Sequence, residues 1–234
     1  MKNKQLSKKE LPVQSDDFHL AKIMFRHILP LILAVTGSSL LVILCISFDY
    51  TYGARIINET SMTEYMQQIL LGIAVIAFYR VKTQRYSLRH GAILISGFFL
   101  VLSIRELDFL FDYIRHGFWV YPALAVTGAA IFYAAGAKKQ IVNQLAEILS
   151  APNMRILVCG LFLLLVFSRL FGMGPFWKMI MQDHYMRGVK DVAEEGIELL
   201  CYGLIAYASV STQLYLKRCG STLHQQTKIN EKQL

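Results

Sequence analysis

Apolar residues are arranged along this chain in runs that are long enough to cross a lipid bilayer. A transmembrane helix needs about 20 apolar residues, within a usable range of about 17 to 25. Five runs meet this requirement, and a sixth has the shorter apolar centre "ILLGIAVIAFY" beside Gln67 and Gln68. We therefore predict an all-α integral membrane protein, built as a bundle of six transmembrane helices. The expected spans are residues 27–48, 65–82, 91–111, 118–137, 155–173 and 192–216.

Composition agrees with a membrane protein. Hydrophobic residues make up 55% of the 234 residues and charged residues only 17%, and a soluble fold of this size would have difficulty covering so much apolar surface. The net charge of +8 comes from short basic clusters between the apolar runs. Because no nucleic-acid-binding module is present, we expect the lipid bilayer, and not a nucleic acid, to be the partner.

The positions of the basic residues predict the orientation. With six spans, the two termini and the second and fourth loops carry most of the 24 Lys and Arg residues. The positive-inside rule places these segments in the cytoplasm, whereas five spans would break the alternation. We therefore expect a multi-pass protein of a bacterial-type inner membrane, that is, the plasma membrane. Residues 1–26 and 217–234 would form cytoplasmic tails around a transmembrane domain at 27–216.

Two segments at the predicted outer side are unusually rich in charge. They are "SIRELDFLFDYIRHGFW", at the end of span three, and "QDHYMRGVKDVAEEGIELLCYG", before and within span six. Together they hold half of the 16 carboxylates of the chain. A charge at the centre of a bilayer costs about 2.5–3.5 kcal/mol on insertion scales. This concentration therefore marks the candidate functional site.

Helical spacing predicts how these residues face one another. At about 100° per residue, Arg105, Asp108, Asp112 and His116 would share one stripe, and Glu106 would point away from it. A second stripe, from Asp191 to Tyr202, would face it from span six. Arg169 near the outer end of span five would complete the site. The full candidate cluster is Arg105, Glu106, Asp108, Asp112, His116, Arg169, Arg187, Asp191, Glu194, Glu195, Glu198 and Tyr202.

One interpretation of this cluster is purely structural. Arg105 and Arg169 would form ion pairs with carboxylates of neighbouring helices and so determine which helices pack together. Two deep arginines cannot neutralise all of the acids, however. The acidic surplus needs protons, water, a metal or a cationic ligand, and we expect the site to bind a polar or cationic ligand or a metal.

A metal-dependent membrane enzyme that acts on a lipid-like substrate is an alternative. Asp112 and His116 are spaced i, i+4 and could reach one divalent ion, with Glu194 and Glu198 as further oxygen ligands. The sequence has no HExxH motif and no GxSxG motif, so no residue can be assigned a catalytic role from a motif.

A proton-coupled transporter is a further alternative. Carboxylates and arginines in a pocket of low dielectric can exchange protons near neutral pH. The ligand would be a small polar molecule, or a lipid, that enters from the outer leaflet. Polar residues are sparse in the inner halves of the spans, where Ser96, Thr127 and Ser209 stand out, so the sequence does not indicate a complete pathway. A protein that binds a partner through this charged surface is the remaining class.

Overall fold

The computed structural model of the chain describes residues 14–52 and 61–231, and every regular element within them is a helix. Four helical segments of this part are long and apolar enough to cross a membrane: Ile28–Tyr52, Tyr86–Glu106, Met154–Gly172 and Arg187–Gly220. A bent pair, Val120–Ala135 with Gln140–Leu149, would make a fifth if it counts as one span. The predicted class, a helical membrane protein, is therefore supported.

The chain divides into two compact units, Met1–Gly37 and Ser38–Leu234. Helix α1 (Gln14–Tyr52) crosses the boundary between them. In the first unit the helix contains Pro30 and begins within the stretch that we expected to be a polar tail. The second unit contains the rest of α1 and all of the other helices, and the candidate site lies within it.

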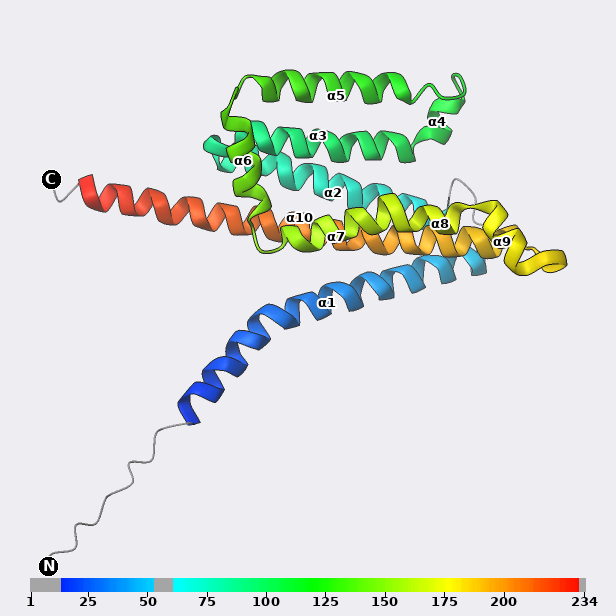
Figure 1. Cartoon of the computed structure of the whole chain (residues 1–234), viewed down its shortest axis with the longest axis horizontal. Coiled ribbons are helices and arrows are strands. Elements are labelled where there is room, and N and C mark those ends of the chain that lie inside the picture. Colours follow the sequence, from blue (N-terminus) through cyan, green and yellow to red (C-terminus); the bar gives the residue numbers. More distant parts are fainter. Residues whose placement is uncertain (1–13, 53–60, 232–234) are drawn as a thin grey trace, which may run out of the picture. The chain divides into compact units, whose positions relative to one another are not determined.

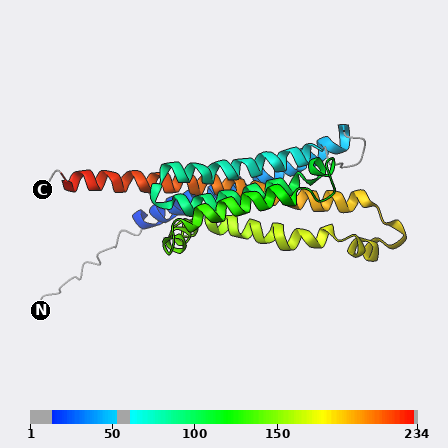
Figure 2. The same cartoon turned by 90° about the horizontal axis from the view of Figure 1, so that it is seen from above.

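Three helices form the centre of the second unit. Helix α2 (Met62–Gln84) packs against both α3 (Arg89–Glu106) and α10 (Arg187–Glu231), as Figures 1 and 2 show. Phe78 of α2 and Phe99 of α3 stack with their ring centroids 5.8 Å apart, and both rings are fully buried. Burying two such rings contributes several kcal/mol, so this contact is a main part of the core.

The end of α3 leads into a tight connection to α5. The short helix α4 (Asp108–Asp112) follows α3, and α5 (Val120–Ala135) returns alongside it (Figure 1). Gly117 has φ +77°, a value that favours glycine. Helices α3 and α5 therefore form an antiparallel hairpin with Gly117 in its turn. The expected span at 91–111 is wrong at its end, because α3 stops at Glu106.

The helix α6 (Gln140–Leu149) is bent by 109° from α5 and closes the opposite end of the bundle. The η1 turn (Tyr86–Leu88) lies at the same end. The side-chain oxygen of Gln144 accepts hydrogen bonds from the backbone N–H groups of His90 and Gly91, at 3.1 and 3.0 Å. Gln144 therefore caps the start of α3 from a neighbouring element.

One long segment, which contains a π-helical part, forms the next candidate span. It consists of α7 (Met154–Phe162), the π segment η2 (Leu163–Phe167) and α8 (Ser168–Gly172). This segment runs beside α10, and α9 (Gly174–Met181) and η3 (Gln182–His184) join it to the start of α10 (Figure 2). The π segment ends directly before Ser168, which is part of the candidate site.

Candidate functional site

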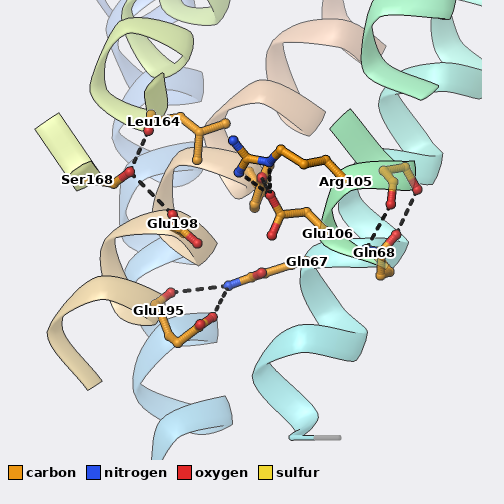
Figure 3. A network of polar contacts seen from close by, with 10 residues as sticks. Gln67, Gln68, Arg105, Glu106, Leu164, Ser168, Glu195 and Glu198 are labelled. Carbon is orange, nitrogen blue, oxygen red and sulfur yellow. Dashed lines mark hydrogen bonds and ion pairs between the residues drawn. The ribbon is translucent and has the colours of Figure 1, made fainter. Parts of the chain in front are cut away.

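The site lies at the end of the bundle where α2 begins, α3 ends and α10 enters. Figure 3 shows polar side chains from α2, α3, α8 and α10 directed toward one another there. Contacts between residues far apart in the sequence confirm that these ends meet. Two hydrogen bonds join Gln68 of α2 to Ser103 of α3. Ser103 Oγ donates to Gln68 Oε1 at 2.7 Å, and Gln68 Nε2 donates to the Ser103 carbonyl at 3.3 Å.

Glu106 is the centre of the first part of the site. Its carboxylate forms an ion pair with Arg105, and it also accepts a hydrogen bond from the Tyr202 hydroxyl of α10 at 2.9 Å. The Arg105 and Glu106 side chains are 25% and 16% exposed, and Tyr202 is fully buried. Glu106, which we predicted to point away from the stripe of Arg105 but included in the cluster, is bonded to Arg105 itself. It faces α10 and connects the two helices.

Glu195 of α10 is held by an amide. Gln67 Nε2 of α2 donates to Glu195 Oε2 at 2.7 Å, and Gln67 is 2% exposed (Figure 3). A second, longer contact of 3.5 Å joins the same nitrogen to the Glu195 carbonyl. The donor is neutral, so it positions the carboxylate but does not balance a charge.

Glu198 of α10 also has a neutral partner. The Ser168 hydroxyl lies 3.3 Å from Glu198 Oε1, and Glu198 is 6% exposed. Ser168 follows directly after the π segment, and its Oγ also lies within hydrogen-bond distance of the Leu164 carbonyl, so the two acceptors share its single proton. Wide π turns leave backbone carbonyls without their usual helical partner and occur frequently at functional sites. Here the turn brings a hydroxyl against a buried carboxylate.

The acidic residues closer to the start of α10 do have basic partners. Lys190 Nζ lies 2.7 Å from Glu194 Oε2 and 3.4 Å from Asp191 Oδ1, and Arg187 Nε is 3.6 Å from Asp191 Oδ2. Glu194 Oε1 also lies so close to Gly172 of α8 that a Cβ added there would clash with it. The ion pairs lie within α10, and only the approach of Glu194 to Gly172 connects α8 to α10.

The remaining predicted residues lie outside this buried group. Asp108 and Arg169 are exposed, and within the described residues no ion pair includes either of them. The prediction that Arg169 neutralises deep carboxylates is therefore not supported. Asp112 and His116 are at the surface beyond α3, so the predicted continuous stripe from Arg105 to His116 is wrong because the helix ends first.

Asp112 and His116 interact with each other. His116 Nδ1 and Asp112 Oδ2 are 2.8 Å apart, and Asp112 Oδ1 accepts the Gly117 N–H at 2.9 Å. The Gly117 N–H first, and the His116 ring second, lower the pKa of Asp112 below its usual value. Across residues 14–52 and 61–231, no group of three or more His, Cys, Asp or Glu side chains is arranged to hold a metal ion. Asp112, His116, Glu194 and Glu198, the predicted ligands, thus do not form one site.

Several polar residues of this region did not enter the predicted cluster. Gln67 and Ser168 hold the two buried carboxylates. Asp49 at the end of α1 accepts the N–H groups of Met62 and Thr63, at 2.6 and 3.0 Å, and so caps α2. The signal for each was available in the sequence, since a polar residue inside an apolar run needs a partner.

Comparison of the chain with protein-family models, with curated proteins and with solved structures finds no match.

Proposed function

We propose that this chain is a plasma-membrane protein with six spans and two cytoplasmic termini, and that its outer polar cluster binds a cationic group. Helix α2 would be the additional span. Its 23 residues extend about 35 Å, which exceeds the hydrocarbon thickness of a bilayer. Its polar residues explain its lower hydropathy, because Gln67 and Gln84 bond to α10 and not to lipid.

The opposite end of the bundle supports the proposed orientation. Arg85, Lys138, Lys139 and Arg155 gather around α6, which is an amphipathic helix bent away from the direction of the spans. Such helices are typical of the membrane interface. The positive-inside rule then assigns this end to the cytoplasm and the polar cluster to the outside.

One observation carries the proposed function. The two buried carboxylates of α10, Glu195 and Glu198, each have a neutral hydrogen-bond donor, and Arg105 is already paired with Glu106. An isolated buried carboxylate is costly unless a positive charge or a proton neutralises it. A network that served only for packing would gain by placing a basic residue there. The arrangement instead leaves two buried carboxyl groups without a counter-charge, which either bound protons or a cation must supply.

The lining of the cluster fits a small cation. Two carboxylates, an amide and two hydroxyl groups, those of Ser168 and Tyr202, present oxygen atoms within one region. Protonated amines and hard metal cations both prefer such ligands. The shared chemistry of the ligand is therefore a positive charge surrounded by oxygen acceptors.

Thermal unfolding of the detergent-purified protein tests this proposal. A ligand that binds the folded state raises the unfolding temperature, so the titration would use Na⁺, K⁺, Mg²⁺, Ca²⁺ and small amines at constant ionic strength. We expect one of these cations to stabilise the wild type and to have no effect on Glu198→Gln. Asp183→Asn is the matched control, because it removes an exposed carboxylate between α9 and α10. The proposal fails if Glu198→Gln and the wild type respond identically to every cation.

Proton-coupled transport is a second candidate, and the π segment favours it. A π turn within a span is a place where a helix can change its register, and it lies directly beside Glu198. Reconstituted vesicles with an internal pH dye would report a substrate-dependent proton flux. Flux in the wild type and its loss in Glu198→Gln would support transport. A response of the unfolding temperature to a cation, without any flux, would support binding alone.

A further inference from the structure

A second polar site lies at the opposite end of the bundle from the carboxylate cluster. A pocket of about 490 Å³ opens there between the start of α3 and the end of α5. Its lining consists of Arg89, His90, Phe132, Tyr133, Ala135 and Gly136. The pocket therefore combines a cationic edge with aromatic walls.

Contacts around Arg89 hold its guanidinium in place at this edge. Arg89 donates to the Tyr86 hydroxyl, and its guanidinium carbon lies 4.1 Å from the centroid of the Tyr86 ring. An arginine carries five N–H donors in a rigid fork. The contact with Tyr86 uses one of them and orients the others, which reduces the entropy lost when an anion binds.

His90 forms the neighbouring part of the wall. Its ring lies against Tyr133, with centroids 5.1 Å apart, and its Nδ1 atom is buried without a hydrogen-bond partner among the described residues. A buried ring nitrogen without a partner is unusual, but this atom is closed to solvent and so offers no contact to a ligand in the pocket.

The charge around the pocket is entirely positive. Lys82 Nζ lies 5.5 Å from the centroid of the Tyr133 ring, and Lys138 and Lys139 follow α5 at the surface. No carboxylate occurs in residues 79–91 or 132–140. Glu147 on α6 is near this end, but it is bound to Arg85 at 2.7 Å. The pocket is thus complementary to an anion.

The form of the pocket identifies the kind of anion. Gln144 already occupies the first N–H groups of α3, so an anion here would be held by side chains. Phe132, at the rim, is 84% exposed on a helix that we place in the bilayer. An anion with attached acyl chains could place its charge beside Arg89 and its chains along Phe132. We propose that this pocket binds the phosphate group of an anionic phospholipid from the adjacent leaflet.

Native mass spectrometry of the full-length protein in a mild detergent tests the proposal. The probes are phosphatidylglycerol and phosphatidylcholine with identical acyl chains, and inorganic phosphate. We expect phosphatidylglycerol to bind about tenfold more tightly than phosphatidylcholine, because both carry the same phosphodiester but only phosphatidylcholine brings a choline cation beside Arg89 and Lys82. Arg89→Gln should remove this preference. Arg80→Gln, which removes an exposed charge of α2 outside the pocket lining, should retain it.

The outcomes separate the possible explanations. Equal binding of the two lipids to the wild type, or an unchanged preference in Arg89→Gln, would overturn the proposal. If inorganic phosphate binds as tightly as phosphatidylglycerol, the proposal is also overturned, because the pocket would then be a site for a free anion. The lipid comparison on the wild type needs no variant, so it decides the question even if Arg89→Gln does not fold.

Discussion

Gln67 of α2 donates a hydrogen bond of 2.7 Å to Glu195 of α10, although 128 positions separate the two residues in the sequence. This contact fixes the rotation of α2 against α10 and holds the Glu195 carboxylate at the Gln67 amide (Figure 3). An amide orients the carboxylate without neutralising it. Predictions for the polar cluster therefore depend on which partners carry charge.

Glu106→Gln should destabilise the protein. The change leaves the guanidinium of Arg105 largely buried without its counter-charge. Breaking a buried ion pair from one side costs about 3–5 kcal/mol when both partners are fully buried. Because these side chains are partly exposed, we expect about 1–3 kcal/mol. Chemical or thermal unfolding in detergent measures the loss, and an unchanged unfolding midpoint would show that the pair is unimportant for folding.

Glu198→Gln should have the opposite effect on stability while it abolishes function. The amide has nearly the same shape, can still accept from Ser168, and removes a buried charge that has a neutral partner. We expect an unfolding midpoint equal to or above that of the wild type. Loss of both stability and function would instead indicate a structural role. The comparison with Glu106→Gln on the same apparatus is the internal control.

Gly97→Ala should weaken the packing of α3 against α5. An added Cβ would lie 2.7 Å from the Cβ of Ala130, which is attached directly to the α5 backbone and cannot rotate away. Overpacking of this kind costs about 1–3 kcal/mol. Gly128→Ala on α5 is the matched control, since its added Cβ meets nothing within 4 Å. If both variants unfold at the same temperature, the close approach of the two helices is not a constraint.

Asp49→Ala should loosen the beginning of α2. The carboxylate accepts the N–H groups of Met62 and Thr63 and the hydroxyl of Thr63. Loss of a capping residue costs about 0.5–2 kcal/mol. Hydrogen exchange should accelerate in the first turn of α2. Thr51→Ala, which removes an exposed hydroxyl bonded to its own helix, should leave that exchange unchanged.

The connection after α4 should become less ordered in acid. The lowered pKa of Asp112 means that its carboxylate form is favoured in the folded turn. That contribution is present above the ordinary Asp pKa of about 3.9 and is lost as the pH falls through the lower folded value. Exchange of the Gly117 amide, measured by NMR relative to the intrinsic rate at each pH, should therefore lose protection in this acidic range. In Asp112→Ala the protection should be absent at every pH.

The sequence allowed the helices to be predicted because lipid imposes a simple requirement on composition. Runs that must face hydrocarbon are apolar over their whole length, and four of them appear as candidate spans. Helix α2 is less apolar because Gln67 and Gln84 face partners inside the bundle. Its helical length could be anticipated from the sequence. Its position between α3 and α10 could not, because the hydropathy of a segment carries no information on which helices pack against it.

The facing of the charged residues was harder to predict. The assumed stripe required a helix that continued to His116, but the backbone N–H of Leu107 closes α3 through the carbonyls of Ser103 and Ile104. No Gly or Pro marks this end. Helical spacing also did not show that the Arg105 side chain reaches the neighbouring carboxylate of Glu106. The amide and hydroxyl partners could be found only when the neighbouring helices were placed.

The π segment at Leu163–Phe167 also keeps two residues of its span, Gly160 and Ser168, on the face that contacts α10. Gly160 packs against Ile205 of α10, with an added Cβ only 3.1 Å from that side chain, and Ser168 meets Glu198 on the same helix. In a regular α-helix, eight residues would rotate the second contact by about 80° from the first. The wide turn absorbs about one residue and cancels most of that offset. If the same residues formed a regular α-helix, Ser168 would turn about 80° away from Glu198, although every contact residue would still be in the chain.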